Sequence, residues 1–367
     1  MPPKVGCPQL SRPRHGGQRA WAVTLANCPD SALLDFSASI SPFKPPEGVL
    51  RAIVAALPQL GYYPDPTYNS LRWAGGQVWG LPPDWILPGN GSAELLTLAG
   101  RALSACWETV IIEPAFGDYA RALQGSGAKI RPVVWPVFEP FPLQTLLALG
   151  DRRRGLILNN PHNPSGHLLT QAEILACLER FAWVVVDEAF MDFLPPCDQQ
   201  SLIAFLPQFP QLIILKSLTK FYALAGLRLG FALGHPQILE SWQHWRDPWP
   251  VNSLAVSAAI AAWQESSFAS QLWAWLPPAR QALFEALQSF SALTPRPSAA
   301  NFLLVKTRLP APELQLQLLT KHRILIRDCL SFPSLGEHFF RVAVRTPAEN
   351  QQLIDALEAV LAVNSFG

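Results

Sequence analysis

Short apolar runs recur along the chain and alternate with segments in which apolar residues have helical spacing. The runs predict strands at residues 109–113, 129–134, 155–159, 182–187, 211–216 and 229–233. Between them, residues 93–103 and 171–180 have helical spacing, and we expect Ser92 and Thr170 to be their N-caps. Strands that alternate with helices in this way predict an α/β fold, with a mostly parallel sheet covered by helices.

The pattern changes near residue 250. Longer segments then have helical spacing, and later apolar runs predict two more strands, so the helices are expected at 253–265 and 278–290 and the strands at 301–305 and 339–344. This second pattern is typical of a smaller α+β domain. We therefore expect a large domain at residues 45–250 and a small C-terminal domain at residues 251–367, preceded by an N-terminal arm at residues 1–44.

Composition limits the classes of function. The 367 residues carry a formal net charge of +1 and only 15% charged residues, which argues against nucleic-acid binding. No apolar run approaches the roughly 18 residues that span a bilayer, and the first residues lack the apolar segment of a signal peptide, so we expect a cytoplasmic protein. The six cysteines form no Cys-x-x-Cys pair and no metal-ligand spacing with histidine, so we expect no metal site.

One lysine follows an apolar strand in a distinctive setting. Within residues 213–231, Ser217 and Thr219 lie three and one positions before Lys220, and the following loop ends at Arg228. An amine can attach the aldehyde of pyridoxal 5'-phosphate (PLP), while hydroxyl and guanidinium groups can hold its dianionic phosphate. A lone lysine after a strand is usually a solvated loop residue, so this interpretation depends on the residues around it.

Other segments supply the groups that such a site needs. The strand 182–187 ends in Asp187, which can pair with a protonated pyridine nitrogen. Another predicted strand runs into a turn rich in Asn, Pro and Gly that contains Asn163. Small residues open a helix at Gly91, where backbone amides can bind phosphate, but Glu94 occupies the third glycine position of a dinucleotide fingerprint and excludes that motif.

In this order, the segments resemble the fold-type I PLP enzymes of the class I and II aminotransferase family over nearly the whole chain. The resemblance implies that residues 45–250 bind PLP, with Lys220 as the covalent anchor and Asp187 as the pyridine partner. It implies that Asn163 binds the ring hydroxyl and Phe116 stacks on the ring. The groups that it assigns to the cofactor phosphate are Ser92, Ser217, Thr219, Arg228 and backbone amides at Gly91 and Ala93.

The same resemblance implies a homodimer. Tyr63 is similar to a tyrosine that reaches the cofactor phosphate of the neighbouring subunit, which would give two shared active sites.

Within this family, the motifs are similar to histidinol-phosphate aminotransferases and to their relatives, the threonine-phosphate decarboxylases of cobalamin biosynthesis. His15-Gly16-Gly17, followed by residues 34–42, resembles the decarboxylase opening. This implies decarboxylation of a phosphorylated amino acid, L-threonine O-3-phosphate, to (R)-1-amino-2-propanol O-2-phosphate. The resemblance implies that the N-terminal arm, residues 1–44, contributes to the substrate site and the small domain. The groups that would hold the substrate are His15, Ser39, Arg327 and Arg341.

Two alternatives remain at this point. One is a histidinol-phosphate aminotransferase, because both enzymes accept phosphorylated amines on one scaffold. The other is a catalytically silent PLP-fold binding protein. The chain argues against it, because it keeps the full set of Asn163, Asp187, Lys220 and Arg228.

The chain departs from the family pattern at several positions. Phe190 stands where the family often has a tyrosine that shares the ring oxygen with the asparagine, so Asn163 is expected to act alone. Ser39 and Ser41 replace two asparagines of the decarboxylase opening. Phe116 replaces a common tyrosine, a change that preserves stacking.

Overall fold

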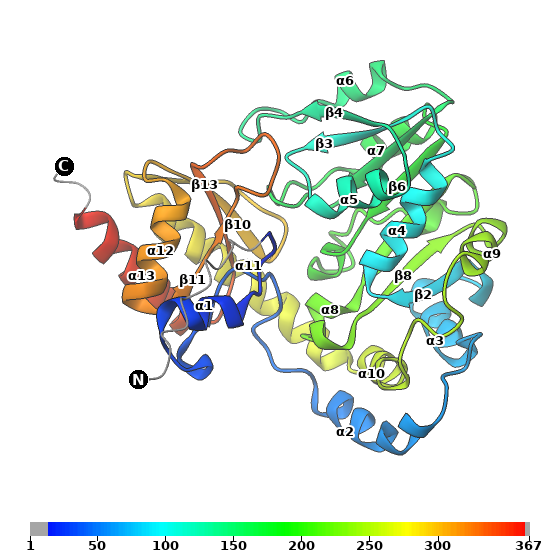
Figure 1. Ribbon diagram of the computed structural model, residues 1–367, viewed down its shortest axis with the longest axis horizontal. Helices are drawn as coiled ribbons and strands as arrows, with labels where there is room; N and C mark the ends of the chain where they lie inside the picture. The colour runs from blue at the N-terminus through cyan, green and yellow to red at the C-terminus, as the bar shows by residue number, and fades with distance from the viewer. Residues whose placement is uncertain (1–13, 364–367) are drawn as a thin grey trace, which may run out of the picture.

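The structure is a computed structural model that describes residues 14–363, and a seven-stranded sheet forms its larger part (Figure 1). The strand order is β2-β8-β7-β6-β5-β3-β4, and only β8 runs antiparallel to its neighbours. The strands are β2 Ile86–Asn90, β3 Glu108–Glu113, β4 Ile130–Val134, β5 Arg154–Asn159, β6 Trp183–Asp187, β7 Leu212–Ser217 and β8 Leu229–Gly234. The predicted α/β fold with a mostly parallel sheet is confirmed.

Helices cover both faces of this sheet, which explains why its strands are apolar throughout. In β6, Val184 and Val186 belong to one hydrophobic cluster, whereas Val185 belongs to another. Alternate residues of one strand therefore enter two separate cores, as expected for a parallel strand buried on both faces. The helices in this part of the chain are α3 Asn69–Trp79, α4 Ser92–Leu103, α5 Gly117–Gly125, α6 Leu143–Ala148, α7 Gln171–Leu178, α8 Leu218–Phe221 and α9 Pro236–His244.

A second, antiparallel sheet has the order β12-β13-β10-β9 and lies beside the first (Figure 1). Its strands are β9 Leu293–Pro295, β10 Phe302–Thr307, β12 Arg327–Asp328 and β13 Phe339–Ala343. The neighbouring helices are α11 Ser266–Gln288, α12 Ala311–His322 and α13 Pro347–Val363.

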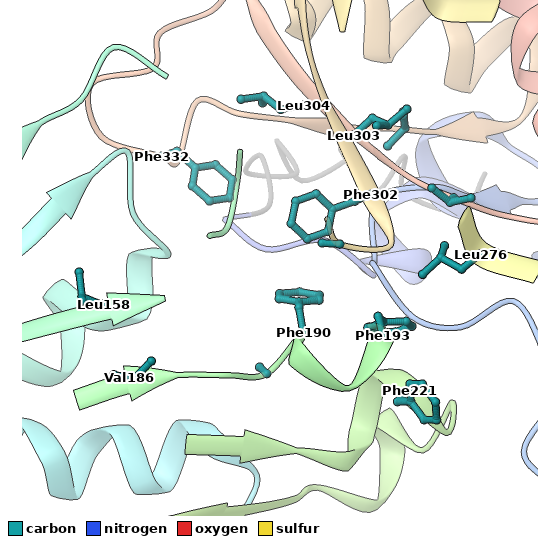
Figure 2. Packing of buried hydrophobic residues seen from close by; sticks show 14 of the residues in the cluster. Leu158, Val186, Phe190, Phe193, Phe221, Leu276, Phe302, Leu303, Leu304 and Phe332 are labelled. Atoms are coloured by element: carbon teal, nitrogen blue, oxygen red, sulfur yellow. The ribbon is translucent and has the colours of Figure 1, made fainter. Parts of the chain in front are cut away.

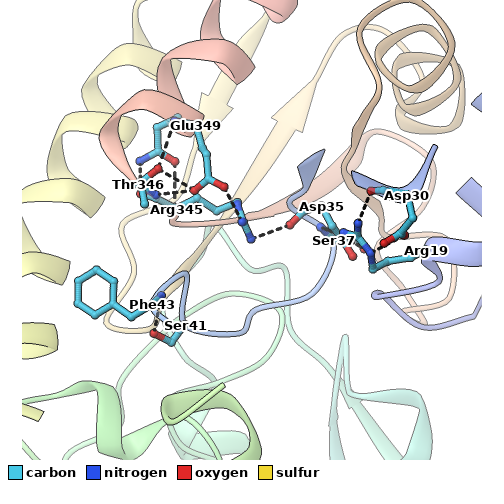
Figure 3. Close-up of polar contacts among 10 residues, drawn as sticks. Arg19, Asp30, Asp35, Ser37, Ser41, Phe43, Arg345, Thr346 and Glu349 are labelled. Carbon is cyan, nitrogen blue, oxygen red and sulfur yellow. Dashed lines mark hydrogen bonds and ion pairs between the residues drawn. The ribbon is translucent and has the colours of Figure 1, made fainter. Parts of the chain in front are cut away.

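The N-terminal segment lies against these C-terminal elements. Strand β1 (Leu34–Asp35) pairs in parallel with β11 (Ile324–Leu325), and α1 (Arg19–Ala26) packs on α12. Figure 3 shows Arg345 between two partners, because its guanidinium donates to Glu349 Oε1 at 2.6 Å and to the Asp35 carbonyl at 3.1 Å. This contact ties β1 to the end of the small sheet.

Helix α10 (Ser253–Gln264) packs against α2 (Glu47–Ala56) and α3. The expected boundary near residue 250 places α10 in the C-terminal domain, although its partners belong to the larger part. The domain boundaries themselves stay a prediction, and residues 1–13 of the arm lie outside the described chain.

Aromatic side chains join the two sheets (Figure 2). The rings of Phe190, just after β6, and Phe302, on β10, lie edge to face with centroids 5.0 Å apart. On the side of the large sheet, Phe193 packs on Phe221 of α8, with ring centroids 5.4 Å apart. The carboxyl end of the large sheet therefore meets the small sheet at the aromatic contact between Phe190 and Phe302.

Most predicted elements agree with the observed ones within one or two residues, and Thr170 caps α7 with a capping box to Glu173. The prediction of Ser92 as an N-cap was wrong, because Gly91 has the non-helical backbone and Ser92 is the first helical residue. The helix expected at 278–290 begins earlier, at Ser266, and passes through two prolines. Its buried apolar face outweighs the two missing backbone donors.

None of the helices within residues 14–363 combines the length and apolar character needed to cross a membrane.

Candidate active site

A cavity of about 520 Å³ lies where the carboxyl end of the large sheet faces the small sheet and the N-terminal segment. Open α/β sheets bind ligands at this edge. The cavity brings together residues that are distant in sequence. The predicted site residues that line it are His15, Ser39, Gly91, Ser92, Ala93, Phe116, Asn163, Asp187, Thr219, Lys220, Arg228, Arg327 and Arg341.

Lys220 occupies this cavity at the end of the short helix α8. Its Nζ lies 4.9 Å from the centroid of the Phe190 ring. Burial lowers the pKa of Lys220 below its ordinary value, and the charges of Arg341 and Arg228 lower it further, while Asp187 opposes them. A lower pKa leaves more of the amine unprotonated, which is the form that attacks an aldehyde.

Lys216 lies only four residues earlier in a different setting. It lines a larger cavity of about 660 Å³ that contains none of the predicted site residues. Its Nζ is 2.5 Å from Asp192 Oδ1 and 3.6 Å from Glu188 Oε2, and these carboxylates raise the pKa of the lysine despite its burial. A charged, ion-paired ammonium is a poor nucleophile, so the structure favours Lys220 as the reactive amine.

Asp187 ends β6 with both carboxylate oxygens in hydrogen bonds. Tyr119 Oη donates to Oδ2 at 2.7 Å, and the backbone N–H of Ala189 donates to Oδ1 at 3.0 Å. Burial and the neighbouring carboxylate raise the pKa of Tyr119 well above its ordinary value. Sequence reasoning missed Tyr119; the available signal was its spacing of three residues from Phe116, which places both on one face of α5.

A phosphate cradle is present at the start of α4. Gly91 has φ 75°, and a Cβ atom there would lie 2.5 Å from Nη2 of Arg228. Only glycine therefore permits this approach of backbone and guanidinium. Ser92 and Ala93 begin the helix at the cavity wall, where unpaired N–H groups and the helix dipole favour an anion.

The Ser217 and Thr219 hydroxyls lie 2.8 Å apart. Thr219 lines the cavity, whereas Ser217 is buried behind it and is not among the lining residues. The structure therefore places Ser217 next to Thr219 and leaves its predicted contact with phosphate untested.

Two arginines lie side by side on neighbouring strands of the small sheet, and both line the cavity. Arg327 of β12 is paired directly with Arg341 of β13. Arg341 Nη1 donates to Asn163 Oδ1 at 2.5 Å, and burial lowers the pKa of Arg341 to about 10. Arg327 donates to the Arg14 carbonyl and to Ser331 Oγ. Two adjacent guanidinium groups in a partly buried cavity are suited to a substrate with two anionic groups.

The two N-terminal motifs contact each other. A Cβ atom on Gly16 would lie 2.1 Å from the Ser37 carbonyl oxygen, and the Gly17 N–H donates to Ser37 Oγ at 2.8 Å. Ser37 Oγ in turn donates to Asp35 Oδ1 at 2.6 Å. The glycines thus let the arm lie directly on the Asp-Phe-Ser segment, which positions His15 at the cavity.

The His15 ring is exposed and lies 5.9 Å from the Phe116 ring, edge to face. The buried hydroxyl of Ser39 has no hydrogen-bond partner within the described chain. Both side chains are therefore open to a ligand in the cavity. Tyr63 is not in the cavity of its own chain; it is 79% exposed and stacks on Trp249 at 4.4 Å.

Residues 14–363 hold no group of three or more His, Cys, Asp and Glu side chains arranged to bind a metal ion, and Cys7 lies outside this range.

The family model for class I and II aminotransferases matches residues 31–357, so the chain belongs to this family and is a PLP-dependent enzyme. The site fits the cofactor, since it combines an enclosed lysine, a buried carboxylate and a phosphate cradle that a Cβ atom would fill.

Two relatives represent the two reactions. The threonine-phosphate decarboxylase of Salmonella typhimurium is 36% identical over 356 residues, which cover 95% of this chain and 96% of that protein. The histidinol-phosphate aminotransferase of Symbiobacterium thermophilum is 33% identical over 337 residues, which cover 90% and 91%.

A solved structure, histidinol-phosphate aminotransferase from Sinorhizobium meliloti in complex with pyridoxal-5'-phosphate, is similar with a TM-score of 0.85 and 25% identity over 95% of each chain. The L-threonine-O-3-phosphate decarboxylase from Porphyromonas gingivalis shares the fold, with a TM-score of 0.81 and 24% identity over 90% of this chain and all of that one.

Proposed function

We propose that the protein decarboxylates L-threonine O-3-phosphate to (R)-1-amino-2-propanol O-2-phosphate in cobalamin biosynthesis. The observation that carries this proposal is the contact of the His15-Gly16-Gly17 segment with Ser37 at the wall of the cavity. The Salmonella relative supports this proposal. The adenosylcobalamin biosynthesis bifunctional protein CobDQ of Leptospira interrogans also supports it; the two chains are 29% identical over a match that covers 96% of this chain and 41% of CobDQ.

We propose the following roles around the cofactor. Lys220 holds PLP covalently, and Asp187 keeps the pyridine nitrogen protonated. Asn163 donates its amide N–H to the ring oxygen, because Arg341 already engages Oδ1. Bound PLP supplies the electron sink that stabilises the negative charge left when a bond at the substrate α-carbon breaks.

Phe116 would cover one ring face. The cofactor phosphate would lie against the start of α4, with Arg228, Thr219 and Ser217 as further donors and Tyr63 contributed by a second subunit.

The substrate has a carboxylate and a phosphate, and the cavity offers a matching pair of guanidinium groups. We propose that Arg341, which contacts Asn163, holds the carboxylate, and that Arg327, which contacts Ser331, holds the phosphate together with His15 and Ser39. The bond that breaks must stand perpendicular to the cofactor ring. By binding the carboxylate, Arg341 would hold the bond between the α-carbon and the carboxylate perpendicular to the ring. This orientation favours loss of carbon dioxide over loss of the α-proton.

The second candidate is a histidinol-phosphate aminotransferase, which the Symbiobacterium relative and the Sinorhizobium structure favour. In that reaction, Lys220 would carry the proton from the α-carbon of the substrate to the cofactor, and Arg341 would hold the carboxylate of a 2-oxo acid. The requirement for a 2-oxo acid separates the two functions.

We further propose a homodimer. The face formed by α2 and the following turn exposes apolar side chains, and Tyr63 continues this face. The exposed residues on it are Leu50, Val54, Leu57, Leu60, Tyr62 and Tyr63, with exposed fractions of 45–79%. Several large apolar side chains exposed along one short segment are typical of an interface, and a second copy covering them would bring Tyr63 to the neighbouring subunit.

Phosphate dependence tests the proposed substrate. Carbon dioxide release should be at least about 100-fold more efficient with L-threonine O-3-phosphate than with L-threonine, because L-threonine lacks the phosphate that Arg327, His15 and Ser39 would bind by charge-assisted hydrogen bonds. Replacement His15→Ala should raise KM for threonine phosphate more than it weakens PLP binding. Equal efficiency with both amino acids would contradict the assignment of a phosphate subsite.

A further inference from the structure

Within the described residues, Tyr119 makes the one side-chain hydrogen bond that the carboxylate of Asp187 receives. Its hydroxyl lies 2.7 Å from Asp187 Oδ2, and the tyrosine is only 3% exposed. The backbone N–H of Ala189 holds the other oxygen. Each carboxylate oxygen accepts two hydrogen bonds, so these two donors leave room for a third donor from the cavity.

We infer that Tyr119 is a positioning residue for Asp187: it fixes the carboxylate and stabilises its charged form, so that the proton between carboxylate and cofactor stays on the pyridine nitrogen. This inference rests on the proposed role of Asp187 but not on the identity of the substrate. Protonated pyridine is what makes the cofactor an electron sink, so Tyr119 contributes to chemistry through Asp187.

The physical basis is the competition for one proton. A hydrogen bond donated to a carboxylate favours its ionised form, and more so in a buried site. Without this bond, transfer of the proton from the ring nitrogen to Asp187 becomes easier, since it converts a buried ion pair into two neutral groups.

Tyr119 acts as a donor and not as a base. Burial and the adjacent charge of Asp187 raise its pKa well above the ordinary value, so the hydroxyl keeps its proton throughout the physiological range.

The helix that carries Tyr119 also carries the stacking ring. Phe116 is the N-cap of α5, and its ring lies 5.7 Å from that of Tyr119, edge to face. Because α5 also packs on α4, one structural unit sets the ring face, the carboxylate and the phosphate cradle. A shift of this helix turn would therefore move the ring contact and the carboxylate together.

The chain offers a matched control. Tyr68 is also buried, at 2% exposed, and its hydroxyl donates to the Val251 carbonyl at 3.1 Å and accepts from the Val251 N–H at 3.0 Å. It does not line the cavity. Tyr119→Phe and Tyr68→Phe each remove one buried hydroxyl, so a general loss of stability is common to both and an effect on the cofactor is specific to Tyr119.

The experiment measures the pyridine nitrogen directly, with ¹⁵N-labelled PLP in the wild-type protein and in the Tyr119→Phe, Tyr68→Phe and Asp187→Asn variants. We expect the ¹⁵N shift of wild type and Tyr68→Phe to report a protonated nitrogen, and that of Tyr119→Phe to move towards the unprotonated value. PLP affinity of Tyr119→Phe should fall about tenfold, which corresponds to about 1.4 kcal/mol.

A PLP analogue with carbon in place of the ring nitrogen provides the second readout. It has no N–H to offer Asp187, so Tyr119→Phe should bind it as well as wild type does. An unchanged ¹⁵N shift and unchanged PLP affinity in Tyr119→Phe would overturn the inference and leave Tyr119 a structural residue. If Asp187→Asn also leaves the shift unchanged, the failure lies in the proposed role of Asp187 instead.

Discussion

Replacement of Gly91 by alanine tests the phosphate cradle. The backbone of Gly91, at φ 75° and ψ 164°, lies in a region open essentially only to glycine, so alanine should cost about 1–3 kcal/mol of folding free energy. The new Cβ atom would also lie 2.5 Å from Arg228 Nη2, which forces the guanidinium away. Loss of a charge-assisted contact with phosphate should weaken PLP binding by about 10- to 100-fold.

The assay combines denaturant unfolding of the apoprotein with titration of PLP by its absorbance. Gly80→Ala is the control, because Gly80 has φ 65° but a Cβ atom there would have no neighbour within 4 Å. It should lose about 1 kcal/mol of stability and keep wild-type PLP affinity. A Gly91→Ala variant that loses stability yet binds PLP normally would refute the assignment of the cradle.

Other predictions follow from the same geometry. Asp187→Asn should retain bound PLP but slow turnover by at least about 100-fold, and near-normal turnover would make Asp187 a structural acid. Mixing inactive Tyr63→Ala and Lys220→Ala subunits should partly restore activity, because one site of each heterodimer keeps both groups; verified heterodimers without activity would exclude a shared site. Burial lowers the pKa of His162 to about 3 in the folded protein. The unfolded chain therefore binds more protons, and stability should fall as pH drops from about 6.5 towards 3. His162→Asn should flatten this dependence in unfolding measured against pH, and an unchanged slope would show that other groups cause it.

Much of the fold could be predicted because parallel strands that are buried on both faces appear in the sequence as continuous apolar runs. The predicted ends of β6, which carries Asp187, and of β7, which precedes Lys220, differ from the observed ends by no more than one residue. The start of α11 was missed because local rules treat Pro277 and Pro278 as a helix boundary, whereas the tertiary contacts of the helix stabilise it across both.

In the candidate site too, short sequence motifs could be recognised, whereas contacts between distant segments could not. The motifs predicted that one site would contain Lys220, Asp187, Asn163 and Arg228. The pairing of Arg327 with Arg341 depends on strand register, and the bond of Tyr119 to Asp187 joins residues 68 positions apart, so local patterns do not reveal either. Tyr63 lies outside the cavity of its own chain, and the explanation that a second subunit uses it stays a prediction.

The central claim is decarboxylation of a phosphorylated amino acid, and product analysis in a single preparation tests it most directly. The purified PLP-loaded protein is given L-threonine O-3-phosphate without any 2-oxo acid, and in parallel histidinol phosphate with 2-oxoglutarate. We predict one carbon dioxide and one (R)-1-amino-2-propanol O-2-phosphate for each threonine phosphate consumed, none of either with Lys220→Ala, and little glutamate in the parallel reaction. Efficient glutamate formation from histidinol phosphate with no carbon dioxide from threonine phosphate would contradict the account and establish the aminotransferase.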